Sequence, residues 1–397
     1  MDIIDEINGK RILIWGYGRE GKSTERFLKR CCKPASVAVY EGGREGICEA
    51  DYDYIIKSPG IVMREDHPKY TSQTELFLNQ FRRNVIGITG TKGKSTTSSM
   101  LYHVLRECAD RPVFLVGNIG QPCLDDFEEI SGDTIVVYEM SCHQLAHTRV
   151  SPHIAVFLNL FEEHLDYYGT MERYFEAKSH IAAYQEADDI FFAGENVPGI
   201  STAAKTVVIK KEEGEPYALK LAGAHNQYNA QFVYRIAVEV FHCGRQEVLR
   251  SMERFAGLPH RLEYVGTVGG VRYYDDSIST IPEASIRAAE SIPEVQTMLL
   301  GGMDRQINYD ILVDFIRKNR QIRFICAYAS GKRIFAEAGD CPNCCYVEDL
   351  KQAVAMAKRV TEPGRACILS PAAASYGYFK NFEERGEAFV QYLLENS

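Results

Sequence analysis

The 397-residue sequence predicts an α/β protein with largely parallel sheets, divided into three domains. Short apolar runs alternate with helical patterns along the chain, and many runs end in glycine, proline or a polar residue before a helix begins. This alternation is typical of βαβ units. The chain is also too long for one ordinary hydrophobic core, so that two to three domains are expected.

Boundaries between the predicted domains are placed near residues 80 and 257. The first precedes a strand that feeds a glycine-rich loop, and the second follows a helical pattern at residues 225–243. The expected domains are therefore 1–80, 81–256 and 257–397. The predicted strands cover residues 11–16, 36–41, 54–60, 84–90, 134–140, 154–160, 189–194, 272–277, 297–302, 324–329 and 366–371.

Composition narrows the classes of partner. Hydrophobic residues make up 45% and charged residues 25% of the chain, as in soluble globular proteins. The formal net charge of -9 argues against a broad nucleic-acid surface. The N-terminal stretch lacks the pattern of a secretory signal, and no apolar run has membrane-spanning length. We expect a cytoplasmic monomer that binds neither nucleic acid nor membrane.

The cysteines give little functional information. There are 12, scattered along the chain, with one cluster, "CPNCC", at residues 341–345. A zinc or redox site would need a second ligand pair or a βαβ context directly after a strand. Neither is evident in the sequence, so a surface loop with free thiols is predicted.

A glycine-rich turn lies near the N-terminus. Gly16, Gly18 and Gly21 form G-x-G-x-x-G after the apolar run "RILIW", and Glu41 follows the next run. Glycines let a diphosphate approach the backbone at a helix start. The unit is only about half of a full dinucleotide-binding domain, which favours a Rossmann-like half-site for a nucleotide diphosphate. The alternatives are a turn without a ligand and an NAD site.

A second glycine-rich stretch, "NVIGITGTKGKSTT", has the context of a phosphate loop. It runs from an apolar strand through a turn into a helix, with Lys94 and Ser95 at the helix start. Ile88 stands where the general signature has its first glycine, and Thr89-Gly90-Thr91 supply backbone amides instead. In such loops the lysine neutralises phosphate charge and the hydroxyl binds Mg²⁺.

Other candidates follow predicted strands. Glu139 ends an apolar run in the same domain, where a carboxylate beside a phosphate loop is a natural Mg²⁺ ligand. A later loop carries His164, and the helix after it carries Lys178. Taken alone, His164 would be a structural histidine and Lys178 would be a solvated lysine. In the last third, polar groups that follow apolar runs are candidate ligands because open α/β sheets bind ligands there. They are Arg261, Asp276, Arg305, Ser375 and Lys380.

These stretches together, in this order, resemble the Mur ligase family of ATP-dependent amino-acid ligases. The resemblance runs nearly end to end and includes "GITGTKGKSTT", "EMSCHQL", "NLFEEHLDYYG", "HNQYNA", "GLPHRLE" and "FKNFEERG". The family's phosphate loop departs from the general signature in the same way. The resemblance implies a Rossmann-like UDP-binding domain, a P-loop ATPase-like central domain with a parallel sheet, and a Rossmann-like C-terminal domain.

The resemblance also implies an activity. The blocks are similar to those of members that add glutamate to UDP-N-acetylmuramoyl-L-alanine, a step of peptidoglycan precursor synthesis. ATP would activate the alanine carboxylate as an acyl phosphate, and the glutamate amine would then displace phosphate. ATP and two Mg²⁺ ions are implied. The alternatives are a glutamate ligase with another acceptor, an NAD oxidoreductase, and a non-catalytic module that binds UDP-sugars.

Site residues carried over from the family fall into four groups. The UDP-substrate contacts implied are Gly18, Arg19, Glu20, Gly21, Glu41, Ser58, Asn118, Ser141 and Gln144. The ATP contacts implied are Gly90, Thr91, Lys92, Gly93, Lys94, Ser95, Thr96, Asn229, Arg261 and Asp276. The catalytic residues implied are Lys94, Glu139, His164 and Lys178, with Ser95, Glu139, His164 and a carbamylated Lys178 serving the metal ions. The glutamate contacts implied are Thr280, Arg305, Ser375 and the backbone near Phe382.

Two departures from the family pattern concern the amino-acid site. Family members that use D-glutamate usually read D-S-K-A-T where this chain has Asp276-Ser277-Ile278-Ser279-Thr280. A cation is thus replaced by isoleucine. In the last block Gly377 stands where an aspartate is frequent. The hypothesis is that ligase activity is kept and that glutamate is held differently, with D- and L-glutamate both open as substrates.

Overall fold

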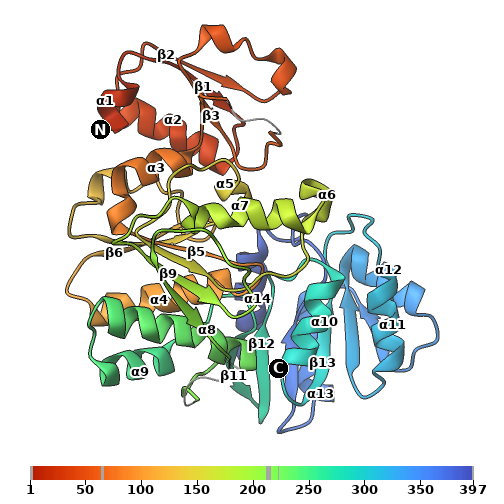
Figure 1. Ribbon diagram of the computed structural model, residues 1–397. Helices are drawn as coiled ribbons and strands as arrows, with labels where there is room; N and C mark the ends of the chain where they lie inside the picture. Colours follow the sequence, from red (N-terminus) through yellow and green to blue (C-terminus); the bar gives the residue numbers. More distant parts are fainter. Residues whose placement is uncertain (1–2, 64–66, 212–215, 222, 396–397) are drawn as a thin grey trace. The chain divides into compact units, whose positions relative to one another are not determined.

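The computed structural model describes residues 3–63, 67–211, 216–221 and 223–395, and contains three β-sheets (Figure 1). The chain forms two compact units. The first comprises Met1–Leu219 and Ala224–Phe255, and the second comprises Lys220–Gly223 and Ala256–Ser397. The first unit holds two of the sheets and the second holds one. The predicted α/β fold with largely parallel strands is confirmed.

The N-terminal sheet has four parallel strands in the order β2-β1-β3-β4. This order places the glycine-rich turn, which follows β1, between β2 and β3. The strands are β1 (Arg11–Trp15), β2 (Ser36–Tyr40), β3 (Tyr54–Lys57) and β4 (Tyr70–Thr71), with helices α1 (Ile3–Ile7), α2 (Arg19–Cys31) and α3 (Gln73–Phe81) and 3-10 turns at Arg44–Gly46, Glu49–Asp51 and Arg82–Asn84.

The central sheet has six parallel strands in the order β10-β9-β8-β5-β7-β6. The strands are β5 (Val85–Thr89), β6 (Val113–Gly117), β7 (Ile135–Glu139), β8 (Ile154–Phe157), β9 (Ile190–Gly194) and β10 (Lys205–Ile209). On one face α4 (Lys94–Cys108) packs against the sheet and against α8 (Ala224–Arg235) and α9 (Arg245–Arg254). On the other face lie α5 (Cys142–Leu145), α6 (Leu165–Tyr168) and α7 (Met171–Ala183) (Figure 1).

The two sheets of the first unit share one hydrophobic core. Ile12 and Ile14 of β1 belong to the same buried cluster as Val136 and Tyr138 of β7, with Phe77 of α3 between them. Residues from the first two predicted domains, 1–80 and 81–256, therefore belong to one compact unit. The division into three domains stays a prediction.

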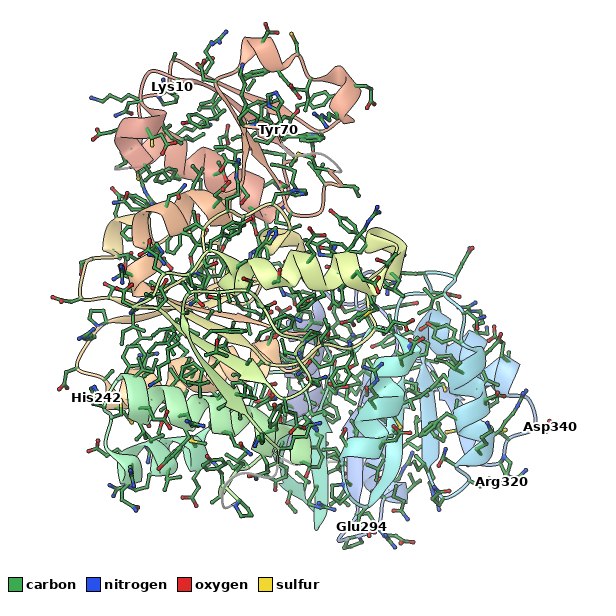
Figure 2. The ribbon with its side chains drawn as sticks, in the orientation of Figure 1. Lys10, Tyr70, His242, Glu294, Arg320 and Asp340 are labelled. Atoms are coloured by element: carbon green, nitrogen blue, oxygen red, sulfur yellow. The ribbon has the colours of Figure 1, made fainter. Side chains whose placement is uncertain are left out.

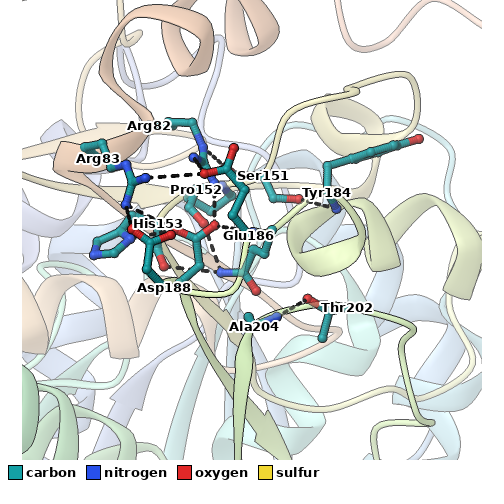
Figure 3. Close-up of polar contacts among 12 residues, drawn as sticks. Arg82, Arg83, Ser151, Pro152, His153, Tyr184, Glu186, Asp188, Thr202 and Ala204 are labelled. Carbon is teal, nitrogen blue, oxygen red and sulfur yellow. Dashed lines mark hydrogen bonds and ion pairs between the residues drawn. The ribbon is translucent and has the colours of Figure 1, made fainter.

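The base of the central sheet is fixed by charged side chains (Figure 3). The buried Asp189 accepts a hydrogen bond from Arg82 and contacts His153 Nδ1 at 2.7 Å. Arg82 also lies 3.1 Å from Glu186, and Arg83 pairs with Asp188. These pairs join the start of β5 to the turn before β9. They hold the end of the sheet opposite the phosphate loop.

The second unit contains a mixed six-stranded sheet in the order β11-β12-β16-β13-β14-β15. Only the pairing of β11 with β12 is antiparallel among its pairs of named strands. The strands are β11 (Glu263–Val268), β12 (Val271–Asp275), β13 (Val295–Leu300), β14 (Arg323–Ala327), β15 (Cys344–Val347) and β16 (Ala366–Leu369). Helices α10 (Pro282–Ser291), α11 (Asp310–Lys318) and α12 (Tyr328–Ala338) share one core, and α13 (Leu350–Val360) and α14 (Phe382–Leu394) share another.

Every run predicted as a strand overlaps a strand of the structure, but one local prediction needs correction. The cluster at residues 341–345 is not simply a surface loop, because Cys344 and Cys345 begin β15 and pair with β14. Backbone pairing to Phe324 and Ile325 overrides the turn signal of Pro342 and Asn343. The cysteines are free thiols, as predicted. Among the described residues, no helix combines the length and apolar character needed to cross a bilayer.

Candidate active site

The phosphate loop connects the buried strand β5 to helix α4. Gly93 has φ +84°, and a Cβ there would lie 2.7 Å from Asn229 Oδ1, so only glycine fits. Asn229 on α8 therefore lies directly against the loop. Lys94 Nζ donates to the carbonyl oxygens of Gly90 at 2.9 Å and Thr91 at 3.0 Å. The first turn of α4, with Ser95 and Thr96, follows the loop and offers unpaired backbone amides to an anion.

The loop is held in place by Asn159, which follows β8. The Thr91 amide donates to Asn159 O at 2.9 Å, and the Lys92 amide donates to Asn159 Oδ1 at 2.9 Å. Lys92 itself is exposed and pairs with Glu163. Gly90, which has φ +158°, lies in extended backbone. These contacts bring together the predicted ATP residues of the first unit, from Gly90 to Thr96 and Asn229.

Glu139 ends β7, and its backbone is paired with Ile88 of β5. Its side chain is fully buried, and Oε1 accepts a hydrogen bond from Asn118 Nδ2 at 2.8 Å. Oε2 is buried and has no hydrogen-bond partner among the described residues. An unpaired buried carboxylate oxygen carries a desolvation cost, which a bound cation offsets. Glu139 therefore fits the predicted Mg²⁺ ligand.

Lys178 extends from α7 to the same loop. Its Nζ donates to Gly90 O at 2.9 Å and to Thr89 Oγ1 at 3.3 Å, and the side chain is 1% exposed. Burial, and then the neighbouring Lys94 charge, lower the pKa of Lys178 to about 7. A substantial fraction of the amine is therefore uncharged near neutral pH. Only the uncharged amine can react with CO₂ to give a carbamate, so the residue fits the predicted modification.

A cavity of about 380 Å³ opens beside these residues. His164 on its wall caps α6 with a left-handed φ of 58°, an uncommon conformation that persists only where surrounding structure holds it. The cavity is lined by residues of loops and helices that follow strands of both sheets of the first unit. Its lining consists of Pro59, Gly60, Lys94, Asn118, Ser141, Cys142, His143, His164, Tyr167, Tyr174 and Lys178.

The N-terminal glycine turn is a close strand-to-helix connection. Gly16 has φ +92°, and a Cβ on Gly21 would lie 2.1 Å from Gly16 O. Gly18 caps α2, and Ser58 Oγ donates to Gly16 O at 2.9 Å. Glu41 is exposed directly after β2. The turn thus has the geometry that the half-site prediction requires.

Hydrogen bonds link this turn to the central domain. Arg19 donates to Gly120 O, and Gln144 Nε2 donates to Glu20 Oε1 at 2.7 Å. Gln144 Oε1 accepts from the Ser141 amide at 2.8 Å in a capping box. Burial raises the pKa of Glu20 to about 6. Glu20, Gln144 and Ser141, all predicted substrate residues, therefore form one connected set.

In the second unit the predicted residues are mostly engaged in internal contacts. Asp276 is buried and accepts from the Leu262 amide at 3.2 Å and from Ser370 Oγ at 2.7 Å. Burial raises its pKa to about 6. Arg305 Nη2 donates to Thr280 O at 3.2 Å. Ser375 is buried, Phe382 O accepts from Ser277 Oγ at 2.8 Å, and Arg261 is exposed.

Two residues with potential site functions were not found from the sequence. His143 lines the cavity, and Arg385 is a buried guanidinium that contacts Ser277 and Ala373. His143 stands two positions after the predicted Ser141, which is the only local signal for it. Arg385 lies within the quoted stretch "FKNFEERG", but its partners are distant in sequence.

Fold and cavity define an α/β nucleotide-binding protein that places a phosphate loop beside a buried carboxylate and a buried lysine. Residues 88–203 match the model of the Mur ligase middle domain. The UDP-N-acetylmuramoylalanine--D-glutamate ligase of Lactobacillus delbrueckii subsp. bulgaricus is 28% identical, over 100% of this chain and 99% of the relative. The UDP-N-acetylmuramoyl-L-alanine--L-glutamate ligase of Salinispora tropica is 31% identical, over 99% of each chain.

Solved structures agree on the fold. The MurF ligase of Thermotoga maritima, crystallised in complex with ADP, matches with a TM-score of 0.59 at 17% identity and covers 98% of this chain and 96% of its own. The chain belongs to the Mur ligase family. Members of this family are ATP-dependent, ADP-forming ligases, and this protein is an enzyme of that class. The oxidoreductase and non-catalytic alternatives are therefore wrong.

Proposed function

We propose that the enzyme joins glutamate to UDP-N-acetylmuramoyl-L-alanine through an acyl phosphate, as a cytoplasmic monomer in peptidoglycan precursor synthesis. One observation carries the proposal. The phosphate loop, the buried Glu139 and the buried Lys178 converge within one unit of a chain related end to end to ligases of this substrate. A related ligase with another acceptor has no comparable support.

The phosphate loop and its surroundings would hold ATP. Residues Gly90 to Thr96 would contact the phosphates, and Asn229, Arg261 and Asp276 stay the predicted contacts of the adenosine end. Ser95, Glu139, His164 and carbamylated Lys178 would hold two Mg²⁺ ions. When bound, the ions supply positive charge between two anions, the alanine carboxylate and the γ-phosphate.

The chain's own residues would do the remaining work. Lys94, fixed by the Gly90 and Thr91 carbonyls, places an ammonium where charge develops on the transferred phosphoryl group. Asn118 and Ser141, both on the cavity wall, would contact the muramoyl-alanine arm. The aromatic wall of Tyr167 and Tyr174 would limit the access of water to the acyl phosphate, which water hydrolyses.

Each predicted domain would bind a different substrate. Residues 1–80 would bind UDP through the glycine turn, residues 81–256 would bind ATP, and residues 257–397 would bind glutamate. Gln144 and Glu20 would act at the diphosphate through the set they form with Ser141. The glutamate contacts would be Thr280, Arg305, Ser375 and the Phe382 backbone, with the apolar Ile278 next to them in sequence.

Phosphate release from ATP tests this function. The assay supplies UDP-N-acetylmuramoyl-L-alanine with D-glutamate, with L-glutamate, or with neither. Release that depends on one enantiomer confirms the reaction and identifies the substrate. Isolation of the amide product by mass spectrometry separates ligation from ATP hydrolysis. Absence of release with both enantiomers would overturn the substrate assignment.

A further inference from the structure

Two histidines share the wall of the cavity beside the phosphate loop. His143 is the second residue of α5, and His164 caps α6. Their ring centroids lie 5.2 Å apart, with an angle of 75° between the ring planes. His164 already has a proposed function as a cation ligand, whereas no function has been assigned to His143.

The spacing of the two rings fits one shared ion. A metal–imidazole bond of about 2.1 Å places the ion roughly 3.2 Å from a ring centroid. Two centroids 5.2 Å apart then correspond to an angle of ~109° at the ion, within the range of tetrahedral and distorted octahedral sites. The spacing of the rings is therefore compatible with one shared ion when each ring turns a nitrogen toward it.

The surroundings of His143 favour one ring nitrogen for a ligand. Nδ1 lies 3.6 Å from Cys142 Sγ, which leaves Nε2 for an ion. The Tyr167 ring packs edge-on against His143 with centroids 4.4 Å apart, and Tyr167 Oη donates to Ile61 O at 3.2 Å. Such outer contacts orient metal-binding imidazoles in proteins. The His143 ring is thus held by Tyr167, a neighbouring residue of the cavity wall.

We propose that His143 joins His164 as a second imidazole ligand of a divalent cation, and that this site therefore favours Mn²⁺, Co²⁺ or Zn²⁺ over Mg²⁺. Mg²⁺ prefers oxygen ligands and is usually held by carboxylates, phosphates and water, whereas imidazole suits the later divalent metals. The inference rests on the proposed function only in taking His164 as a cation ligand. Lys94 lines the same cavity and opposes a cation there, as Lys178 does while its amine is unmodified, so nucleotide phosphates should strengthen binding.

Mn²⁺ binding to the full chain tests the proposal without turnover. Free Mn²⁺ is measured by electron paramagnetic resonance in the presence of an ATP analogue with a methylene bridge, and electron spin echo modulation counts coordinated imidazole nitrogens. The wild type should show two imidazoles, and His143→Gln should show one. The Mn²⁺ dissociation constant should rise about 10-fold or more in the variant. The Mg²⁺ constant, measured by competition, should change less than about 3-fold.

The matched control is His242→Gln, which changes an exposed histidine of the same unit (Figure 2) and should leave Mn²⁺ binding unchanged. If His143→Gln unfolds, His143→Phe keeps the ring packing against Tyr167 and removes only the nitrogens. One imidazole in the wild type, or unchanged Mn²⁺ affinity in the variants, would overturn the proposal. Because binding is read without glutamate, a failed ligase assay leaves this result interpretable.

Discussion

Buried polar groups differ in their hydrogen bonding between the cavity of the first unit and the candidate site of the second unit. In the cavity, Glu139 Oε2 is buried without a hydrogen-bond partner among the described residues. In the second unit, both oxygens of the buried Asp276 accept hydrogen bonds. Groups left incompletely satisfied cost stability and indicate a ligand site, whereas satisfied groups hold a fold together.

Lys178→Ala should give the largest effect. We expect the rate of phosphate release to fall about 1000-fold, because the variant loses a buried amine that contacts the phosphate loop and the support it would give to a cation. Affinity for UDP-N-acetylmuramoyl-L-alanine, measured by calorimetry, should change little, since the glycine turn is untouched. Unimpaired turnover would contradict the comparison, because the cavity would then have no catalytic function.

Arg385→Met tests whether satisfied buried hydrogen bonds stabilise the second unit. The buried guanidinium donates to Ser277 Oγ at 2.9 Å, Ser277 O at 2.7 Å and Ala373 O at 3.0 Å. Removing it leaves buried acceptors unpaired and should destabilise the second unit by about 3 kcal/mol. Amide hydrogen exchange of β12 and β16 is the suitable measurement, because the single tryptophan, Trp15, belongs to the first unit.

The control for this change is Arg320→Met, at an exposed position of the same unit (Figure 2). It should alter stability by less than about 0.5 kcal/mol. Equal exchange rates in Arg385→Met and Arg320→Met would show that the buried contacts contribute nothing.

Burial explains which parts of the fold were predictable. Strands such as β5 and β7 are buried along their whole length and appear in the sequence as continuous apolar runs. The strands missed, β4, β6, β10, β11 and β15, all lie at an edge of their sheets. β10 is short and largely exposed, and β15 begins in a cysteine-rich turn signal. Their pairing depends on a neighbouring strand that local sequence does not show.

Some residues of the candidate site could likewise be predicted from local sequence, and others could not. Gly93, Lys94 and Glu139 follow from strand–loop–helix order, so local sequence was sufficient to bring them together. His143 and Arg385 were not predictable, because their surroundings come from segments far away in the chain. Asn229 needed the resemblance, since nothing in a helical pattern indicates that one asparagine lies against Gly93.

Asp276→Asn should have a smaller effect on stability, and it tests whether Asp276 holds the second unit together or contacts the nucleotide. The change keeps the shape of the side chain but places an amide where Leu262 N and Ser370 Oγ now donate, so we expect a loss of about 1 kcal/mol in the second unit. The KM for ATP should change less than about 3-fold if the packing contacts dominate. A 10-fold rise in this KM at unchanged stability would instead place Asp276 at the nucleotide.

The smallest effect expected is a pH dependence at His260. Its Nδ1 lies 2.7 Å from Oδ2 of the buried Asp275, and this hydrogen bond, with the Asp275 charge, raises the pKa of His260 in the folded state. Glu263 and Glu383 act in the same direction, while burial opposes them. The protonated form is therefore favoured by folding.

The sign of the effect follows from linkage. Stabilisation by His260 should be complete below the unfolded pKa of about 6.5 and should be lost as pH rises through the higher folded pKa. Hydrogen exchange of β12 in wild type and His260→Gln should thus differ most at pH 6 and least at pH 9. A difference that grows with pH would mean that the neutral imidazole makes the stabilising contact. His260 would then belong with the groups of the second unit whose packing, rather than charge, holds the sheet against α14.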